Sequence, residues 1–236
     1  MSEALPILFH DQHLVAIHKP SGMLVHRSPI SRDTVFVLQT LRDQIGQRVY
    51  PVHRLDRATS GVLLFGLSPQ AAQAVVQQFE ARRVDKEYRA LARGWVDDHG
   101  FIDHPVADEE GNNIAQDALT EYRCLARVEL PFAVDRYPTS RYSLVSVIPH
   151  TGRRQQIRKH FKHISHHLIG DTTHGNGKHN RFFREQYGIH RLMLTSHRLG
   201  FQHPFSGQRI ELQANPEPEW QRLFDAFGWQ REQSLG

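Results

Sequence analysis

The chain has 236 residues, of which 39% are hydrophobic, and a formal net charge of +4 with its 17 histidines counted as neutral. No apolar run approaches the roughly 20 residues of a transmembrane helix, and no secretory signal stands at the N-terminus, so we expect a cytoplasmic protein that does not contact a membrane. Cys124 is the single cysteine, which excludes an internal disulfide, and the basic charge is compatible with a nucleic-acid partner.

The first fifty residues are expected to form two strands and a helix. Apolar residues at 7–9 and 14–17 predict the strands, and the turn residues 19–22 follow the second one. Apolar residues then recur at helical spacing from 35 to 45, with Asp33 or Thr34 as the N-cap and Gly46 as the stop.

Residues 53–66 combine a charged turn with a buried strand. Residues 53–61 read HRLDRATSG, and the four residues that follow are all apolar and end at Gly66. An apolar run this short, bounded by turn residues, predicts a buried strand. Asp56 lies between two arginines just before that strand. This setting is compatible with a structural ion pair and with a reactive carboxylate.

The rest of the chain predicts one α+β domain over residues 1–236. Ser68 and Pro69 have the order expected at the start of a helix. No repeat or linker is present, which favours a single domain. The further predicted elements are a half-buried strand at 86–93, strands at 121–128, 142–148, 192–194 and 199–201, helices at 153–163 and 217–227, and a loop or small excursion at 97–116 with a solvated acidic run at 108–113.

The predicted helix at 153–163 carries a basic stripe. Arg154, Arg158 and Lys162 are four residues apart and are expected to lie on one face. Five histidines follow one another closely in the same region, at positions 160, 163, 166, 167 and 174. They lack accompanying cysteines, and their spacing spreads them around a helix, so we expect no metal ion. An RNA-facing or solvated basic patch fits them better.

Asp56 has no second carboxylate near it in the sequence, as a glycosidase would need. Serine-hydrolase, phosphate-binding and dinucleotide-binding motifs are also absent from the sequence. A lone carboxylate among cations suits a reaction that needs an anion at a sugar carbon and does not need an activated water.

Several separated segments, in the same order along the chain, resemble the RluA-type family of pseudouridine synthases. The HRLD-x-x-TSG pattern at 53–61 is highly specific, whereas each of the others is weak alone. The matching segments are Lys19-Pro20-Ser21-Gly22, residues 53–61, Lys86-Glu87-Tyr88, Thr151-Gly152-Arg153 through Gln156-Ile157-Arg158, Ile169-Gly170-Asp171, and Leu199 through His203-Pro204 with Gly207.

The resemblance implies a pseudouridine-synthase catalytic fold, with a mixed, mainly antiparallel sheet flanked by helices and an RNA-binding cleft. It also implies an isomerase without cofactor or metal. The chain lacks an S4-like RNA-binding module, and its segments at 136–142 and 188–194 are similar to short members of the family that modify tRNA. We therefore expect tRNA as the partner and a monomeric protein.

By the same resemblance, Asp56 is the catalytic residue, either as a nucleophile at ribose C1′ or as a base at C2′. Tyr88 would pack on the uracil and help to remove the C5 proton, and Leu194 would lie beneath the base. Each has an ordinary core residue as its alternative. Arg158 would pair with the catalytic aspartate, because a buried carboxylate needs a cation to stay ionised; its alternative is a phosphate contact. Arg54 would fill the gap left by the flipped base, or form a salt bridge to the local backbone.

The resemblance has two departures, since the family usually has histidine where this chain has Gln155 and Thr195. These changes remove titratable rings and are expected to alter substrate choice or rate. An rRNA-specific synthase and a non-catalytic tRNA-binding or folding protein remain the alternative functions. The residues expected to grip RNA are Arg153, Arg154, Lys159, Lys162, Lys178, Arg181 and Arg184.

Overall fold

The computed structural model describes residues 4–26, 34–107 and 114–229. The chain forms two compact units, and each unit is built from two separate segments. The first unit holds residues 1–87 and 195–215, and the second holds residues 88–194 and 216–236. The predicted single catalytic domain over residues 1–236 stays a prediction.

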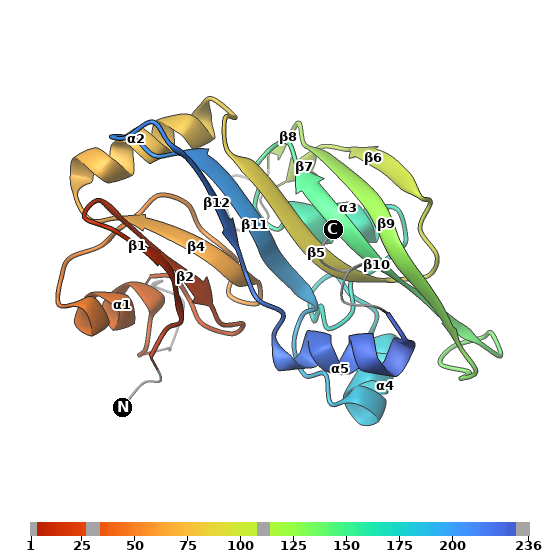
Figure 1. Ribbon diagram of the computed structural model, residues 1–236. Coiled ribbons are helices and arrows are strands. Elements are labelled where there is room, and N and C mark those ends of the chain that lie inside the picture. The colour runs from red at the N-terminus through yellow and green to blue at the C-terminus, as the bar shows by residue number, and fades with distance from the viewer. Residues whose placement is uncertain (1–3, 27–33, 108–113, 230–236) are drawn as a thin grey trace. The chain divides into compact units, whose positions relative to one another are not determined.

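The first unit is a mixed sheet with two helices (Figure 1). Neighbouring strands are antiparallel except for β4 and β11, which run parallel. The spatial order is β1 (Ile7–His10), β2 (Leu14–Lys19), β4 (Ser60–Gly66), β11 (Leu194–Gln202) and β12 (Arg209–Gln213), with β3 (Tyr50–Pro51) also paired to β4, and the helices are α1 (Val37–Ile45) and α2 (Pro69–Glu80).

The core of this unit forms where β2 and β4 pack against α2. Every residue of β4 is buried, as its apolar run predicts. The side chain of Ser68 accepts a hydrogen bond from the Ala71 N–H, so α2 begins at the predicted position. Helix α1 ends at Gly46 as expected, but Phe36 occupies its N-cap in place of Thr34, and Asp33 lies outside the described residues.

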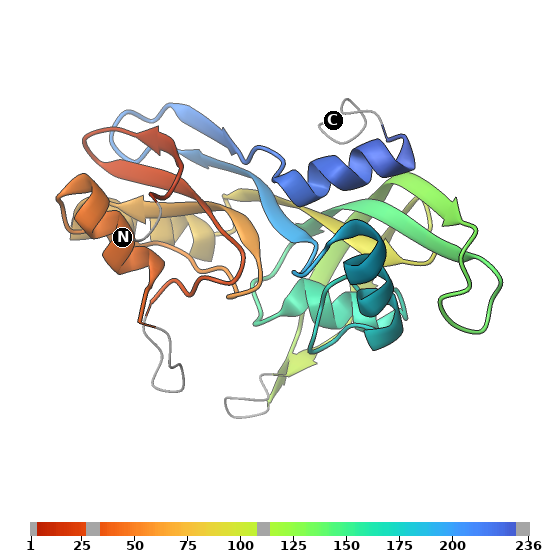
Figure 2. The ribbon, with the colours of Figure 1, turned by 90° about the horizontal axis from the view of Figure 1, so that it is seen from below.

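The second unit has an antiparallel sheet, and Figure 2 shows α3 and α4 on the same side of its strands. Residues 97–116, expected to be a loop or small excursion, include three short strands, while the acidic run at 108–113 lies outside the described residues. The elements are β5 (Asp85–Arg93), β10 (Ser140–Pro149), β9 (Leu119–Leu130) and β6 (His99–Asp103) in spatial order, the pair β7 (Val106–Ala107) and β8 (Ala115–Gln116), and helices α3 (Gln156–His163), α4 (Gly177–Tyr187) and α5 (Pro218–Phe227).

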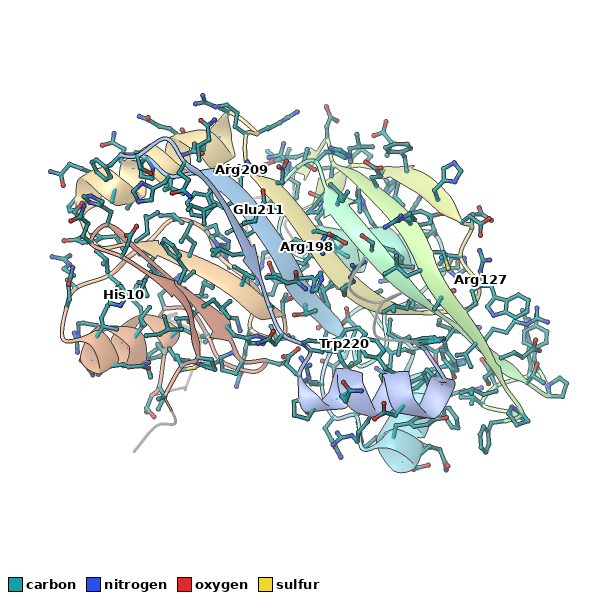
Figure 3. All side chains as sticks on the ribbon, viewed as in Figure 1. His10, Arg127, Arg198, Arg209, Glu211 and Trp220 are labelled. Carbon is teal, nitrogen blue, oxygen red and sulfur yellow. The ribbon has the colours of Figure 1, made fainter. Side chains whose placement is uncertain are left out.

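Strand β5 differs from its predicted half-buried pattern, because residues 89–92 are all buried. One side of the strand contributes Leu91 to a core cluster with Phe183 of α4 and Trp220 of α5, the tryptophan labelled in Figure 3. On the other side of the strand, Ala90 and Ala92 are also fully buried. Both faces of this part of the strand are therefore covered, and alternation is lost.

Only one strand, β11, is found where two were expected at 192–194 and 199–201. It begins at Leu194, so residues 192 and 193 precede it. Helix α5 agrees with its prediction and ends at Gly228, which has a left-handed backbone. No helix in the described part of the chain is long and apolar enough to cross a membrane. The α+β class and the mixed, mainly antiparallel sheet are confirmed.

Candidate active site

Asp56 lies in a tight turn at the entrance of β4. The Thr59 N–H donates to the Asp56 carbonyl over 3.1 Å, which closes the turn. Leu55 and Thr59 on either side are buried, whereas Asp56 itself is half-buried. The carboxylate is thus fixed to the core through its neighbours and remains partly accessible.

A buried lysine joins this turn to the turn that follows β2. The Lys19 side chain is fully buried, and its ammonium donates to the carbonyl oxygens of Pro20 (2.9 Å), Met23 (2.7 Å) and Arg57 (3.1 Å). Hydrogen bonds to a charged group are stronger than neutral ones. The first two matching sequence segments, at 19–22 and 53–61, therefore form one anchored double turn.

The same double turn is completed by two neutral hydrogen bonds. The Gly22 N–H donates to the Arg57 carbonyl over 2.8 Å, and the Ser21 hydroxyl donates to the Ala58 carbonyl over 2.7 Å. Sequence reasoning placed a turn at 19–22 but assigned Lys19 no task. The position of Lys19 inside a segment that matches the family is the only feature of the sequence that points to a role for it.

Gly61 allows β4 to approach β11 closely. Its φ of +105° suits glycine, and a Cβ there would stand 2.2 Å from the Ser196 carbonyl oxygen. Thr195 lies beside Ser60 in the parallel register. Its Oγ1 is buried and has no hydrogen-bond partner among the described residues. Thr195, one of the two positions that depart from the family pattern, therefore lies beside the first residue of β4, the strand that follows Asp56.

His53 supports the strand and is uncharged. Its Nε2 accepts a hydrogen bond from the Leu64 N–H over 3.1 Å, and its ring stacks on Phe79 with centroids 4.9 Å apart. Burial, with a smaller contribution from the nearby Lys86 ammonium, lowers the pKa of His53 to about 3. A neutral ring with an accepting Nε2 is the form this arrangement needs, so His53 is a structural residue of the turn.

Arg54 differs from its neighbours in being exposed. No hydrogen bond or ion pair joins its side chain to another residue in the described ranges. The alternative of a salt bridge to the local backbone is therefore not found there. Its guanidinium is available to a ligand.

Two further predicted site residues lie in the second unit. Tyr88 is half-buried on β5, opposite Val147 of β10, so it is not an enclosed core tyrosine. Leu194 begins β11 and is 3% exposed, which is compatible with both of its predicted roles.

Helix α3 begins later than predicted, at Gln156, because Gln155 has a left-handed backbone with φ of 55°. Arg154 therefore precedes the helix, and Arg158 is buried. The predicted basic stripe of Arg154, Arg158 and Lys162 on one face of the helix is therefore wrong. Only Lys162 of the three lies exposed on the helix.

Gln156 locks the turn before α3 to β9. Its amide oxygen accepts from the Thr151 hydroxyl (2.7 Å) and the Arg153 N–H (3.0 Å). Its amide nitrogen donates to the Leu119 carbonyl (3.0 Å) and the Thr120 hydroxyl (2.9 Å). This fully bonded, buried side chain was not singled out from the sequence, although it lies within the matching segment 151–158.

Arg158 forms a buried ion pair with Asp171. Its Nε and Nη2 donate to Oδ2 and Oδ1 over 2.7 and 2.8 Å, and the two side chains are 6% and 1% exposed. Burial alone would raise the pKa of Asp171, but the Arg158 hydrogen bonds and charge hold it below its usual value. Asp56 belongs to the other unit, so its predicted pairing with Arg158 stays a prediction.

The histidines near α3 mostly serve the fold, which corrects the expected solvated or RNA-facing patch. His160 and His174 are buried, and burial lowers the pKa of both. His160 contacts the His104 carbonyl, and His163 stacks on His104 at 3.7 Å. No group of three or more His, Cys, Asp or Glu suited to a metal ion occurs in residues 4–26, 34–107 and 114–229.

The residues expected to grip RNA are distributed over the second unit. Arg153 donates to the Asp117 carbonyl, and Lys178 pairs with Asp135. Arg153 and Arg154 also line a small hollow of about 160 Å³ beside β7 and β8. Those exposed at the surface are Lys162, Lys178, Arg181 and Arg184.

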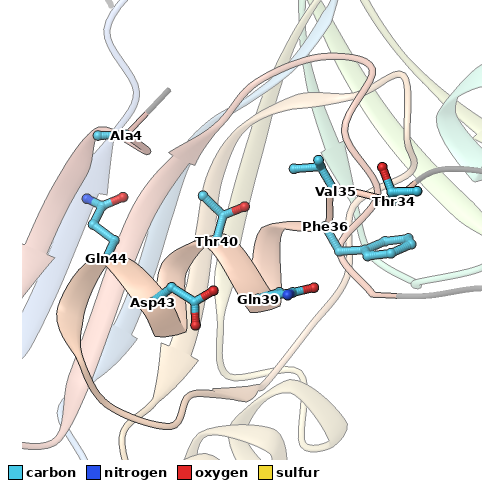
Figure 4. Close-up of a pocket in the computed structure, with 8 residues that line it drawn as sticks. All are labelled: Ala4, Thr34, Val35, Phe36, Gln39, Thr40, Asp43 and Gln44. Atoms are coloured by element: carbon cyan, nitrogen blue, oxygen red, sulfur yellow. The ribbon is translucent and has the colours of Figure 1, made fainter. Parts of the chain in front are cut away.

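A larger hollow of about 330 Å³ lies along α1 in the first unit (Figure 4). Its polar lining includes Gln39, Asp43 and Gln44, and Gln44 is already bonded to the Leu5 backbone. None of the predicted site residues lines it.

The chain belongs to the RNA pseudouridylate synthase family, whose model matches residues 13–163. It is therefore an isomerase. The matched range contains the Asp56 turn, Tyr88 and Arg158. The resemblance noted in the sequence is confirmed.

Relatives of nearly the same length support this assignment. The chain is 47% identical to a tRNA pseudouridine synthase C of Vibrio cholerae serotype O1, over 96% of this chain and 97% of the relative. It is 48% identical to that of Pasteurella multocida, over 95% and 97%. The fold is similar to that of human RNA Pseudouridylate Synthase Domain Containing 4, with a TM-score of 0.74 and 20% identity over 94% of this chain and 93% of that one.

Proposed function

We propose that this isomerase converts a uridine of tRNA to pseudouridine and that Asp56 is its catalytic carboxylate. The observation that carries the proposal is the anchored double turn. Lys19 and the closed turn at Thr59 fix the backbone around a half-buried aspartate, inside the family match. The substrate class rests on the names of the relatives, which are tRNA pseudouridine synthases.

The reaction is an isomerisation, so every atom of the uracil is retained. The bond between uracil N1 and ribose C1′ breaks, the base turns, and C5 joins C1′. The C5 proton leaves and N1 gains a proton, so no net water is consumed. Asp56 acts either by attacking C1′ or by removing a proton from C2′, and both routes need an ionised carboxylate.

The surrounding residues take the roles that the resemblance implies. Tyr88 packs on the uracil, Leu194 lies beneath it, and Arg158 pairs with the catalytic carboxylate. Arg54, exposed beside Asp56 in sequence, occupies the place of the flipped base, where a planar guanidinium stacks well. Arg153, Arg154 and Lys162 bind the RNA backbone.

The finer proposals concern the target and the setting. Segments 136–142 and 188–194 are similar to tRNA pseudouridine synthase C, which acts on uridine 65, and we assign that uridine to this chain. We further propose a cytoplasmic monomer that works without a cofactor. Mapping modified nucleotides in tRNA from cells with and without the protein tests the target.

The catalytic assignment is tested with Asp56→Asn. This variant is expected to fold and to bind tRNA but to release no tritium from tRNA labelled with 5-³H-uridine. Asp43→Asn is the matched control, because Asp43 is an exposed aspartate of the same unit paired only with the adjacent Arg42 among the described contacts. Unchanged tritium release in Asp56→Asn would contradict the catalytic assignment of Asp56.

The substrate assignment needs a separate comparison. Wild-type protein is given labelled tRNA and labelled rRNA transcripts in the same assay, and release from tRNA alone is expected. Release from rRNA alone identifies an rRNA synthase. Tight, salt-dependent tRNA binding without release from either RNA identifies a non-catalytic binding protein.

A further inference from the structure

Asp171 holds Arg158 by one edge of its guanidinium. The ion pair uses Nε and Nη2, which is the side-on edge of the fork. An arginine has five N–H donors, and this pairing engages two of them. The remaining donors, on Nη1 and the outer side of Nη2, point away from that edge and lie outside the ion pair.

Asp171 is itself held from several directions. Its Oδ1 accepts the N–H groups of Thr173 and His174, each over 2.9 Å. Its carbonyl accepts from Asn180 of α4 over 2.8 Å, and the Asn180 amide oxygen accepts from the Gly170 N–H over 2.8 Å. The carboxylate therefore has little freedom to rotate or shift.

A second contact ties this loop to the start of α3. His174 Nε2 lies 2.7 Å from the Gln155 amide oxygen, which only accepts, so that nitrogen carries the hydrogen. Gln155 is the left-handed residue at the start of the helix on which Arg158 stands. The backbone of Arg158 is therefore fixed by the helix, and its guanidinium is fixed by Asp171 of the loop.

We propose that Asp171 is a positioning residue, which fixes the Arg158 guanidinium so that its outer donors meet the reacting carboxylate. This inference rests on the proposed function, in which Arg158 pairs with Asp56. Asp171 compensates the positive charge of Arg158. Arg158 therefore supplies oriented hydrogen bonds to the reacting carboxylate rather than an uncompensated positive charge. Gln155 and His174 serve the same end by fixing the loop, and Gln155 does so without a titratable group.

The first experiment measures kcat and KM for tritium release from labelled tRNA. A misplacement of about 1 Å can cost about 100-fold in rate, so Asp171→Asn is expected to lower kcat about 100-fold while KM stays within about 2-fold. Asp171→Glu, which keeps the charge and the two oxygens, is expected to recover part of the loss. Tyr142→Phe removes a buried hydrogen bond to His179 in the same unit and controls for general loosening.

The second experiment is a double-mutant cycle with Arg158→Lys, which keeps the charge but loses the fork. If Asp171 acts through the guanidinium, adding Asp171→Asn to Arg158→Lys changes kcat by no more than about 2-fold. If the kcat of the double variant is lowered by the product of the two single-variant factors, the inference is overturned. An unchanged kcat in folded Asp171→Asn would also overturn it.

If Asp171→Asn does not fold, Asn180→Ser takes its place. This variant loosens the Asp171 backbone and leaves the ion pair, so a smaller drop in kcat is expected, again absent in the Arg158→Lys background. A drop of the same size in both backgrounds overturns the inference. Failure of the proposed function is a different result, because the wild-type protein then releases no tritium from tRNA.

Discussion

The ammonium of Lys19 donates a hydrogen bond to the carbonyl of Arg57, the residue that follows Asp56. This contact links the end of β2 to the turn that carries the proposed catalytic carboxylate. The same ammonium donates to two further carbonyls, and the side chain has no exposed surface. A lysine is almost never buried unless its charge is well partnered, which indicates that the turn depends on it.

Lys19→Met is expected to lower the free energy of unfolding by about 1.5–3 kcal/mol, the usual worth of hydrogen bonds to a charged group. It is also expected to lower tritium release, because the Asp56 turn loses its anchor. Urea unfolding and the tritium assay measure the two effects. Ser21→Ala removes one neutral hydrogen bond of the same double turn and should cost only about 0.5–1.5 kcal/mol. Equal costs for the two variants would contradict the role given to Lys19.

Gly61→Ala is expected to destabilise the first unit strongly. Its new Cβ would overlap the Ser196 carbonyl, and the backbone φ of +105° adds strain, for a cost of about 3–5 kcal/mol. Gly22→Ala is the control, because Gly22 also has a positive φ, of +86°, but open space around it. Only strain then applies, at about 1–2 kcal/mol. Similar urea midpoints for the two variants would show that close approach of β11 does not matter.

The elements found correctly from the sequence are those with strong local signals. Strand β4 has an unbroken apolar run, α2 has Ser68 and Pro69, and α5 ends at a glycine. These features act within a few residues of chain. Their physical causes, burial and capping, are therefore visible before any tertiary contact is known.

Helix α4 was missed because its sequence, GKHNRFFREQY, has almost no apolar periodicity. Only His179 and Phe183 of this helix are buried. Its ends are fixed by the Asn176 side chain and by the left-handed Gly188. Capping and two buried rings, one of them polar, decide this helix. They do not give the repeating apolar pattern that predicts a helix from sequence.

The partners of buried charges were equally hidden. Resemblance directed attention to Arg158 but left its neighbour Asp171 without a task, although the two form a bidentate ion pair. Hydropathy places a lysine such as Lys19 on the surface, since nothing local reveals three carbonyls arranged around it. Such partners follow from how distant turns meet, which periodicity does not encode.

Acid is expected to destabilise the protein through His179. Burial, with a smaller contribution from Arg93, lowers the pKa of His179 to about 4. Between about pH 4 and pH 6.5 the unfolded chain therefore binds the extra proton. Stability therefore rises with pH there, by up to about 1.4 kcal/mol per pH unit from this group. In His179→Leu the free energy of unfolding should be lower at pH 7 but should fall less steeply on acidification. His99→Leu, at an exposed position, should keep the wild-type slope.

The role of Arg54 is tested by two substitutions with different expectations. Arg54 is exposed and has no hydrogen bond or ion pair within the described ranges, so Arg54→Ala should leave the unfolding midpoint unchanged. It should lower kcat/KM for tRNA, because the gap left by the flipped base is no longer filled, and unstacking a base costs a few kcal/mol. Arg48→Ala, at another exposed arginine of the same unit, is the matched control.

Arg54→Lys separates stacking from simple phosphate binding. A lysine keeps the positive charge but lacks the planar guanidinium, so stacking predicts that Arg54→Lys is as impaired as Arg54→Ala. Phosphate binding predicts recovery in Arg54→Lys, together with a salt slope for tRNA binding in Arg54→Ala that is smaller by about 0.9 for a duplex contact or about 0.7 for a single strand. If Arg54→Lys recovers kcat/KM, Arg54 contacts the RNA backbone and does not fill the gap. If Arg54→Lys does not recover and the salt slope of Arg54→Ala is unchanged, the arginine is inserted among the bases.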